Sequence, residues 1–231
     1  MVELALATGA RKGELFAVQW AGVDLDRRTV RFLDTKNGES RTVPLAQTAV
    51  ATLKAWKAGK LPVGLVFPIN INLLDKAWQA ARAEAAIEDI RFHDLRHSAA
   101  SYLAMSGALK KGGLLPSDID YINLHGTGTQ NNDIAEGTAI KRLFGPQYPA
   151  MSSTKAFTGH TLGACGGIEA VFSILAIEHG TIYPNLRLQT PMKELPFIPV
   201  KGTIKNAAVK HVLSNSFGFG GNCSSLIFSK A

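Results

Sequence analysis

The sequence predicts an α/β fold for residues 109–231 and a mainly helical unit with one small β-hairpin for residues 1–108. In the C-terminal part, apolar runs typical of strands alternate with helical patterns, as in an α/β layer. In the N-terminal part, apolar residues recur at helical spacing, and the turn signal Asn37-Gly38 separates two β-like runs. The 3 tryptophans lie before residue 108 and the 2 cysteines after it. The shift indicates two units joined near the small, polar, glycine-rich stretch 106–113.

Length and composition fit one large or two small globular domains, since 46% of the 231 residues are hydrophobic and 19% are charged. No run reaches the roughly 18 apolar residues of a membrane span, so no membrane partner is expected. The N-terminus lacks the basic start and apolar core of a signal peptide, so we expect a cytoplasmic protein. The net charge of +7 suits DNA or an acidic protein, but also an ordinary solvated surface, because no long basic run concentrates it. Two cysteines argue against a disulfide framework.

Residues 1–108 are expected to form short helices around the hairpin. The expected helices span residues 3–6, 12–20, 47–57, 73–87 and about 92–105, and the expected strands span 28–34 and 40–45. Arg11 lies in the turn between the first two helices, and Lys36 lies near the hairpin tip.

The stretches TGARKGEL, DLDRRTVRF, TKNGESRTVPL and HDLRHSAASYLAMSG resemble the catalytic domain of a phage-type tyrosine recombinase (integrase). That family cleaves DNA by attack of a tyrosine on a phosphodiester, and cations stabilise the charge on the phosphate oxygens. The resemblance implies that Arg11 and Arg96 clamp the phosphate. It also implies that Lys36 protonates the leaving oxygen and that His93 assists proton transfer.

The resemblance ends near Gly107, before the family's second histidine motif and its tyrosine nucleophile. We interpret Tyr102, on the same predicted helix as Arg96, as a packing residue. No strand cleavage is therefore expected from this chain alone. DNA binding and a role in DNA recombination or integration remain as an alternative, through Arg11, Lys36 and Arg96.

The C-terminal part is expected to place two histidines in one cleft. Strands are expected at 119–124 and in 211–230, and helices at 133–144 and 163–179. His125 and His160 are each expected just after a strand and beside glycines, so that their rings project from tight turns. Two neutral imidazoles aimed at one carbonyl can donate hydrogen bonds to an enolate oxygen. A nearby Lys155 ammonium would lower their pKa values and keep them neutral.

Other interpretations of the same residues are weaker. Each histidine taken alone is more typical of a structural residue. The GTGT and GACGG stretches do not have the full G-x-G-x-x-G spacing of a phosphate loop. A zinc site formed by His125, His160 and Cys165 lacks paired ligand spacing, so no metal is expected.

The stretches HGTGTQNND, SSTKAFTGHTLGACGGIEA and NSFGFGGNCSSL resemble the C-terminal part of a β-ketoacyl-[acyl-carrier-protein] synthase II, a condensing acyltransferase of fatty acid or polyketide synthesis with a thiolase-like fold. The resemblance runs from about Leu109 to the end. It implies a catalytic pair, an ordering lysine with its carboxylate partner, two hydroxyls that touch the phosphopantetheine arm, and a gate residue. These are His125 and His160, Lys155 and Glu169, Thr127 and Thr129, and Phe219.

In that family a cysteine carries the acyl chain, and it lies in an N-terminal portion to which nothing here corresponds. We interpret Cys165 and Cys223 as small buried residues, so the expected fold is an incomplete thiolase-like α/β half, inactive alone. The expected partner is acyl carrier protein, whose phosphopantetheine is a substrate arm, and no cofactor is expected. The all-round apolar helix 163–179 would lack cover, which favours self-association. A truncated or fused gene product, or a rearranged reading frame without a cellular role, would have these features.

Overall fold

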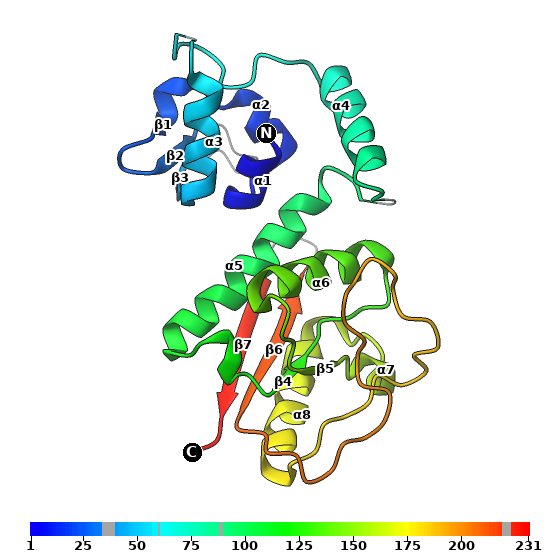
Figure 1. Ribbon diagram of the computed structural model, residues 1–231. Helices are drawn as coiled ribbons and strands as arrows, with labels where there is room; N and C mark the ends of the chain where they lie inside the picture. The colour runs from blue at the N-terminus through cyan, green and yellow to red at the C-terminus, as the bar shows by residue number, and fades with distance from the viewer. Residues whose placement is uncertain (34–39, 60, 88–89, 219–222) are drawn as a thin grey trace. The chain divides into compact units, whose positions relative to one another are not determined.

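The computed structural model describes residues 1–33, 40–59, 61–87, 90–218 and 223–231 and contains two compact units, Met1–Ala99 and Ala100–Ala231 (Figure 1). The division falls within helix α5 (Asp94–Gly112). The stretch 106–113, expected to be a glycine-rich connection, is therefore helical as far as Gly112. The helix continues because Met105 and Leu109 are buried in the core of the C-terminal unit.

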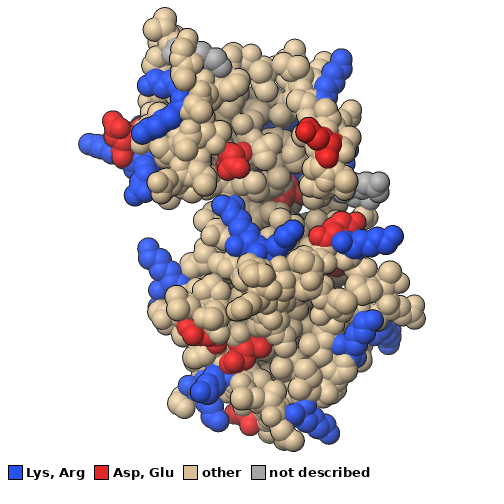
Figure 2. Space-filling model, in the orientation of Figure 1, with Lys and Arg blue, Asp and Glu red and all other residues tan. Residues whose placement is uncertain are grey.

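Basic side chains do not gather into one patch on the face shown in Figure 2, where lysines and arginines lie singly or in small groups among acidic side chains. Among the described residues, Lys12 pairs with Asp75 at 2.6 Å, and Arg91 pairs with the buried Asp94 at 3.0 Å. An ion pair as exposed as that of Lys12 with Asp75 adds little stability. This face therefore has the mixed charge of an ordinary solvated surface.

The N-terminal unit combines helices with a small antiparallel sheet of order β1-β2-β3. Its elements are α1 (Val2–Thr8), α2 (Lys12–Ala17), the 3-10 turn η1 (Trp20–Gly22), β1 (Val23–Asp24), β2 (Thr29–Phe32), β3 (Arg41–Pro44), α3 (Gln47–Lys57), α4 (Ile71–Glu84) and the first turns of α5. The helix expected over 12–20 ends early, at Ala17. It ends there because the backbone of Val18 and Trp20 pairs with that of Val66 and Gly64, at 2.9 Å in each hydrogen bond.

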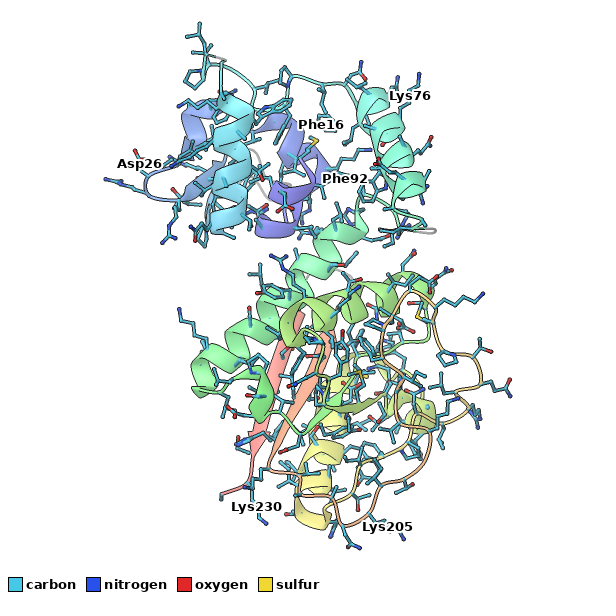
Figure 3. The ribbon with its side chains drawn as sticks, viewed as in Figure 1. Phe16, Asp26, Lys76, Phe92, Lys205 and Lys230 are labelled. Atoms are coloured by element: carbon cyan, nitrogen blue, oxygen red, sulfur yellow. The ribbon has the colours of Figure 1, made fainter. Side chains whose placement is uncertain are left out.

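The core of this unit is formed by buried apolar residues from each helix and from β2. Phe16 and Phe92 point into the interior, whereas Asp26 and Lys76 project outward (Figure 3). Trp78 packs edge-on against Phe92, with ring centroids 5.5 Å apart. Such packing of aromatic and aliphatic side chains indicates a unit with its own hydrophobic core.

The C-terminal unit is built on a four-stranded sheet of order β5-β4-β6-β7. Its strands are β4 (Tyr121–Asn123), β5 (Ala150–Ser152), β6 (His211–Phe217) and β7 (Cys223–Ser229), and its other elements are η2 (Pro116–Asp118), α6 (Gln130–Phe144), α7 (Lys155–Thr158), η3 (Leu162–Ala164) and α8 (Cys165–His179). β4 runs parallel to β5 and β6, while β7 is antiparallel to β6. The end of α5 and α6 share one core with the sheet, and α8 packs against β6 and β7. The predicted α/β layer is confirmed.

Helix α8 meets the sheet with its small and polar residues. Its buried positions are Cys165, Glu169, Ser173 and Ala176. The large side chains lie elsewhere, and Val171 and Ile174 are 55% and 43% exposed. The unit therefore has an apolar helix surface without cover among the described residues.

One stretch of the described residues, Leu162–His179, is long and apolar enough to cross a membrane, with a mean hydropathy of 1.3 over 18 residues. The expectation that no segment is long and apolar enough to cross a membrane is therefore wrong. Large aliphatic side chains raise the mean hydropathy of this stretch despite its interspersed polar residues. Only 22% of this stretch is buried. A core helix of a soluble protein meets the same criterion, so length and composition alone do not make it a membrane span.

Candidate active site

His125 lies just beyond the end of β4, and a buried glutamate holds the turn that carries it. The backbone N–H groups of His125 and Gly126 donate to the two carboxylate oxygens of Glu136, each at 2.9 Å. The side-chain amide of Asn215 donates to the same carboxylate at 2.9 Å. Gly126 has a φ of +34°, and an added Cβ would lie 2.7 Å from Cβ of Ser153. Only glycine fits this turn without movement.

Lys155 begins α7, which two residues separate from the end of β5, and its side chain is buried. Its Nζ lies 3.3 Å from Nδ1 of His125 and forms an ion pair with Glu169 of α8. The segment before it is fixed by Asn123, whose Oδ1 accepts a 3.2 Å hydrogen bond from the hydroxyl of Thr154. A buried ammonium is therefore shared between a carboxylate and an imidazole.

His160 follows the short helix α7, not a strand as expected, because the four residues after Thr154 coil into one turn that Gly159 ends at a φ of +73°. The turn brings the exposed ring of His160 to that of His125, with centroids 5.6 Å apart and planes at 89°. Two histidines distant in sequence therefore face one space.

The hydrogen bonds determine which ring nitrogen of each histidine carries the proton. The Lys155 ammonium can only donate, so Nδ1 of His125 accepts. The backbone N–H of Leu162 donates to Nδ1 of His160 at 3.2 Å. In its neutral form each ring therefore carries its proton on Nε2 and offers one N–H donor.

Burial, the charge of Lys155 and the neighbouring His160 together lower the pKa of His125 to about 3. Burial is the largest cause, so the expected effect of Lys155 is present but second. An imidazole with this pKa is neutral near pH 7 and acts as a hydrogen-bond donor.

Cys165 is not placed as a reactive thiol. Cys165 is buried at the start of α8, and its Sγ donates to Glu169 at 3.2 Å. Burial and this hydrogen bond raise the pKa of the Cys165 thiol, which keeps it protonated. Cys223 is half-buried at the start of β7. The part of the chain that the structure describes has no group of three or more His, Cys, Asp or Glu side chains placed to hold a metal ion.

The remaining predicted residues of this site lie at its edge. The hydroxyls of Thr127 and Thr129 are 2.9 Å apart beyond the His125 turn, and Thr129 is exposed. Phe219 lies outside the described residues.

Sequence reasoning missed Glu136 and Asn215, the two residues that support the turn. Glu136 had a detectable signal, because it is a charged residue among the buried apolar positions of α6. Asn215 had none, since the polar positions of β6 do not differ in pattern from those of an exposed strand face.

The predicted recombinase residues lie in the N-terminal unit. Glu14 is buried between two arginines, with Arg11 Nη1 at 3.3 Å and Arg41 Nη2 at 2.7 Å. Arg96 donates to the carbonyl of Gly9, so it reaches the turn that carries Arg11. His93 is exposed, and its ring lies 5.3 Å from that of His97. Lys36 lies outside the described residues. Tyr102 belongs to the C-terminal unit, where the guanidinium of Arg142 lies over its ring.

Two families match this chain. Residues 1–111 match the phage integrase family, and residues 81–189 match the C-terminal domain of β-ketoacyl synthases. Both resemblances drawn from the sequence are therefore confirmed.

Curated relatives match one part of the chain. The mitochondrial 3-oxoacyl-[acyl-carrier-protein] synthase of Arabidopsis thaliana is 46% identical over 133 residues. The 3-oxoacyl-[acyl-carrier-protein] synthase 2 of Staphylococcus aureus (strain COL) is 41% identical over 129 residues. Each match covers 55% of this chain but only 29% and 31% of the relative. The chain therefore spans less than a third of the length of these relatives.

Solved structures show the same fold. A β-ketoacyl synthase from Burkholderia phymatum STM815 is 36% identical with a TM-score of 0.55, over 58% of this chain and 33% of that one. The AntDE:AntF structure, a type II PKS acyl-carrier protein in complex with its ketosynthase bound to the hexaketide, is 33% identical with a TM-score of 0.53, over 57% of this chain and 33% of that one. The expected incomplete thiolase-like α/β half is confirmed.

Proposed function

We infer the function of this chain from a composite origin: its N-terminal segment belongs to the phage integrases and its C-terminal segment to the C-terminal domains of β-ketoacyl synthases. From this premise we propose that the C-terminal unit performs the decarboxylating half of a condensation. The substrate would be a malonyl thioester on acyl carrier protein. The chain would not form an acyl-cysteine.

The observation that carries this proposal is the pair of Nε2–H donors on His125 and His160, which face one space. In decarboxylation, the bond from the malonyl carbon to the carboxylate breaks and carbon dioxide leaves. The electron pair moves toward the thioester oxygen, where the two N–H groups stabilise the enolate. The enolate then takes a proton from water and leaves as an acetyl thioester.

The phosphopantetheine arm would enter along Thr127 and Thr129, whose hydroxyls lie at the edge of the site. The acyl-carrier complex among the similar solved structures supports a carrier-protein partner for this chain. No other cofactor is needed, because the reaction moves no electrons to or from an acceptor.

Complete condensation needs a thiolate that carries the acyl chain. The sequence has 2 cysteines. One of them, Cys165, is buried and donates a hydrogen bond to Glu169, and the pKa of its thiol is raised. We therefore propose that the isolated chain releases carbon dioxide but makes no carbon–carbon bond.

The test is release of labelled carbon dioxide from malonyl-carrier protein by the purified full chain. His160→Ala and His125→Ala should each lower the rate about 10²–10³-fold, as expected for loss of one oxyanion donor. Thr158→Ala, an exposed change on α7, is the control and should retain the rate. A rate that is unchanged in both histidine variants would refute the proposal.

A second function, DNA binding by the N-terminal unit, is favoured by the arginines near the turn from Gly9 to Glu14. The ion pair with Glu14 holds Arg11 against a carboxylate, which lowers its availability for a phosphate. A DNA titration at two salt concentrations tests this function, because phosphate contacts predict a steep loss of affinity with salt. Affinity that is independent of salt, or of Arg11→Ala, would contradict it.

A further inference from the structure

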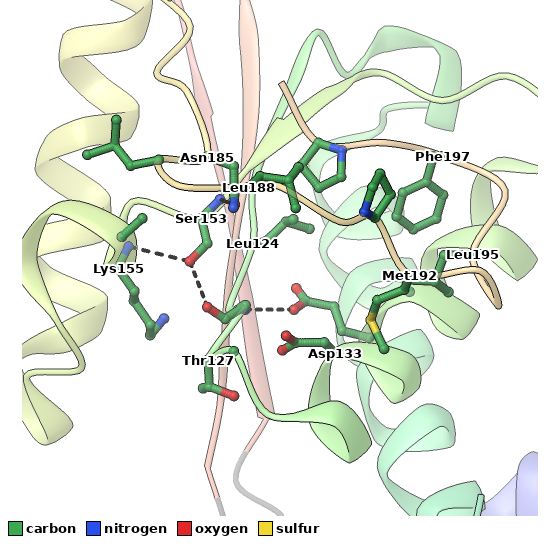
Figure 4. A pocket seen from close by; sticks show the side chains of 18 of the residues that line it. Leu124, Thr127, Asp133, Ser153, Lys155, Asn185, Leu188, Met192, Leu195 and Phe197 are labelled. Carbon is green, nitrogen blue, oxygen red and sulfur yellow. Dashed lines mark hydrogen bonds between the residues drawn. The ribbon is translucent and has the colours of Figure 1, made fainter. Parts of the chain in front are cut away.

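A pocket of about 380 Å³ lies in the C-terminal unit between α6, the turn after His125 and the loop 185–199 (Figure 4). Its walls are largely apolar, with Leu188, Met192, Leu195 and Phe197 of the loop on one side. Lys155, His160 and Thr127 also line the pocket, so it is continuous with the candidate active site. Its size is at the lower end of the range of small-molecule sites, about 300–1,000 Å³.

The loop that covers this pocket is closed and anchored. The backbone N–H of Asn185 donates to the carbonyl of Val200 at 2.6 Å, which joins the two ends. Both ends are tied to β5 and its extension, since Ser153 N–H donates to Asn185 Oδ1 and Val200 N–H to the Met151 carbonyl, each at 2.9 Å. Compact loops with joined ends of this kind often have functional roles.

The inner wall is held by a close contact with α6. An added Cβ at Gly137 would lie 2.5 Å from the methyl carbons of Leu195, so the helix has no side chain at the point where the loop packs. The pocket is therefore formed by the fold and does not require a ligand to open it.

The polar end of the pocket offers one unsatisfied acceptor. Oδ1 of Asp133 has no hydrogen-bond partner among the described residues, although the Asp133 carboxyl group also lies against the side chain of Asn132 and the backbone of Thr127 and Gly128. The neighbouring carboxylate of Glu136 is satisfied by two backbone N–H groups and by Asn215. Lys155 forms its ion pair with Glu169, and its charge also acts on Asp133 and opposes the effect of burial on the pKa of Asp133.

Burial of an acceptor favours a partner that donates a hydrogen bond. We propose that this pocket binds a small amphiphile with an alkyl body and a head group that donates hydrogen bonds and carries no negative charge, such as a primary amine. The alkyl chain packs among the loop side chains, and the head group donates to Oδ1 of Asp133. Oδ1 of Asp133 is an acceptor, so it offers a carboxylate head group no N–H to accept from. The binding does not depend on the proposed decarboxylation.

The experiment is calorimetric titration of the full chain with octylamine and with octanoate, each below its aggregation concentration. Octylamine should bind saturably at one site, and octanoate at least tenfold more weakly. Asp133→Asn replaces the acceptor by an amide that can present N–H. It should therefore weaken the binding of octylamine at least tenfold and strengthen the binding of octanoate. If Asp133→Asn prefers octylamine over octanoate as strongly as the original chain does, the assignment of the head group is overturned.

Met192→Trp on the covering loop fills the pocket and should abolish binding, whereas amphiphile bound to the exposed face of α8 would persist. Leu188→Phe is the second filling variant, used if the first fails to fold by circular dichroism. Equal affinity for the two probes, no saturable binding to the original chain, or undiminished binding to a folded filling variant would each overturn the proposal.

Discussion

Lys155 Nζ lies 3.3 Å from Nδ1 of His125, so a buried ammonium determines which nitrogen of the imidazole carries the proton. The same Nζ is paired with Glu169, whose carboxylate also accepts from Cys165 and Ser216 at 3.2 Å each. The ordering of the histidine and the neutralisation of a buried carboxylate therefore depend on one side chain. Mutation can separate these two roles of Lys155.

Lys155→Met should destabilise the chain by about 3–5 kcal/mol, because Glu169 is left as an uncompensated buried charge. Lys155→Met combined with Glu169→Gln should recover most of this stability, since no charge is then stranded. Urea unfolding of the three proteins measures the difference. A double variant no more stable than the single one would show that the ion pair is not the cause.

Glu136→Ala should lower both stability and decarboxylation, because three donors, the N–H groups of His125 and Gly126 and the amide of Asn215, lose their acceptor. Each buried donor left unsatisfied costs about 1–3 kcal/mol. Glu136→Gln retains one acceptor oxygen, so its stability and its rate should lie between those of the original chain and those of Glu136→Ala. Unfolding and carbon dioxide release are measured together, and a rate of carbon dioxide release that is unchanged in the folded variant would argue against this positioning role.

The sequence predicted those elements whose pattern is set locally. The helix expected over 47–57 has the bounds of α3, because an amphipathic stripe and its neighbours suffice to define it. The helix expected over 12–20 ended at Ala17 because Val18 pairs with Val66, a partner distant in sequence. The glycines near 107–112 did not break α5, since burial of Met105 outweighed their low helix propensity.

The candidate site shows the same limit. The motifs placed His125, His160 and Lys155 together, because their chemistry was visible in residue types and spacing. They did not show that α8 turns small residues such as Ser173 toward the sheet, since a helix apolar on all sides carries no signal for its inner face. Glu136 was missed because its partners are backbone groups that no residue type reveals.

Acid should destabilise the C-terminal unit through His125. Its pKa is about 3 when folded, well below its unfolded value near 6.5, so its contribution is full above pH 6.5 and falls as pH drops toward 3. The contribution of His125 falls with each pH unit below 6.5, whereas the raised pKa values of Asp133 and Glu136 act in the opposite direction. Urea unfolding at pH 7 and pH 5 measures the loss, and His125→Asn should reduce it. His160→Asn, on the exposed ring, is the matched control and should retain the loss.

Gly126→Ala should be more destabilising than Gly128→Ala, although both glycines have positive φ, at +34° and +76°. At Gly126 the new Cβ would lie 2.7 Å from Cβ of Ser153, whereas nothing lies within 4 Å of a Cβ at Gly128. Gly128→Ala, the control, therefore introduces only backbone strain, of order 1–3 kcal/mol. Gly126→Ala adds a steric clash to that strain. Thermal melts of both variants compare them, and equal losses would show that the turn tolerates the clash by moving.

The chain should self-associate through α8, because Val171 and Ile174 are 55% and 43% exposed while the small residues of the helix face the sheet. Burying a large aliphatic side chain is worth about 1.5–3 kcal/mol, so a few such residues favour association at micromolar concentration. Val171→Asp combined with Ile174→Lys should shift the protein toward monomer in sedimentation velocity. Ile198→Lys is the control, since that residue is 61% exposed but lies outside the helix. If the control disperses the protein equally, or if the unmodified chain is a monomer, the face of α8 is not the contact.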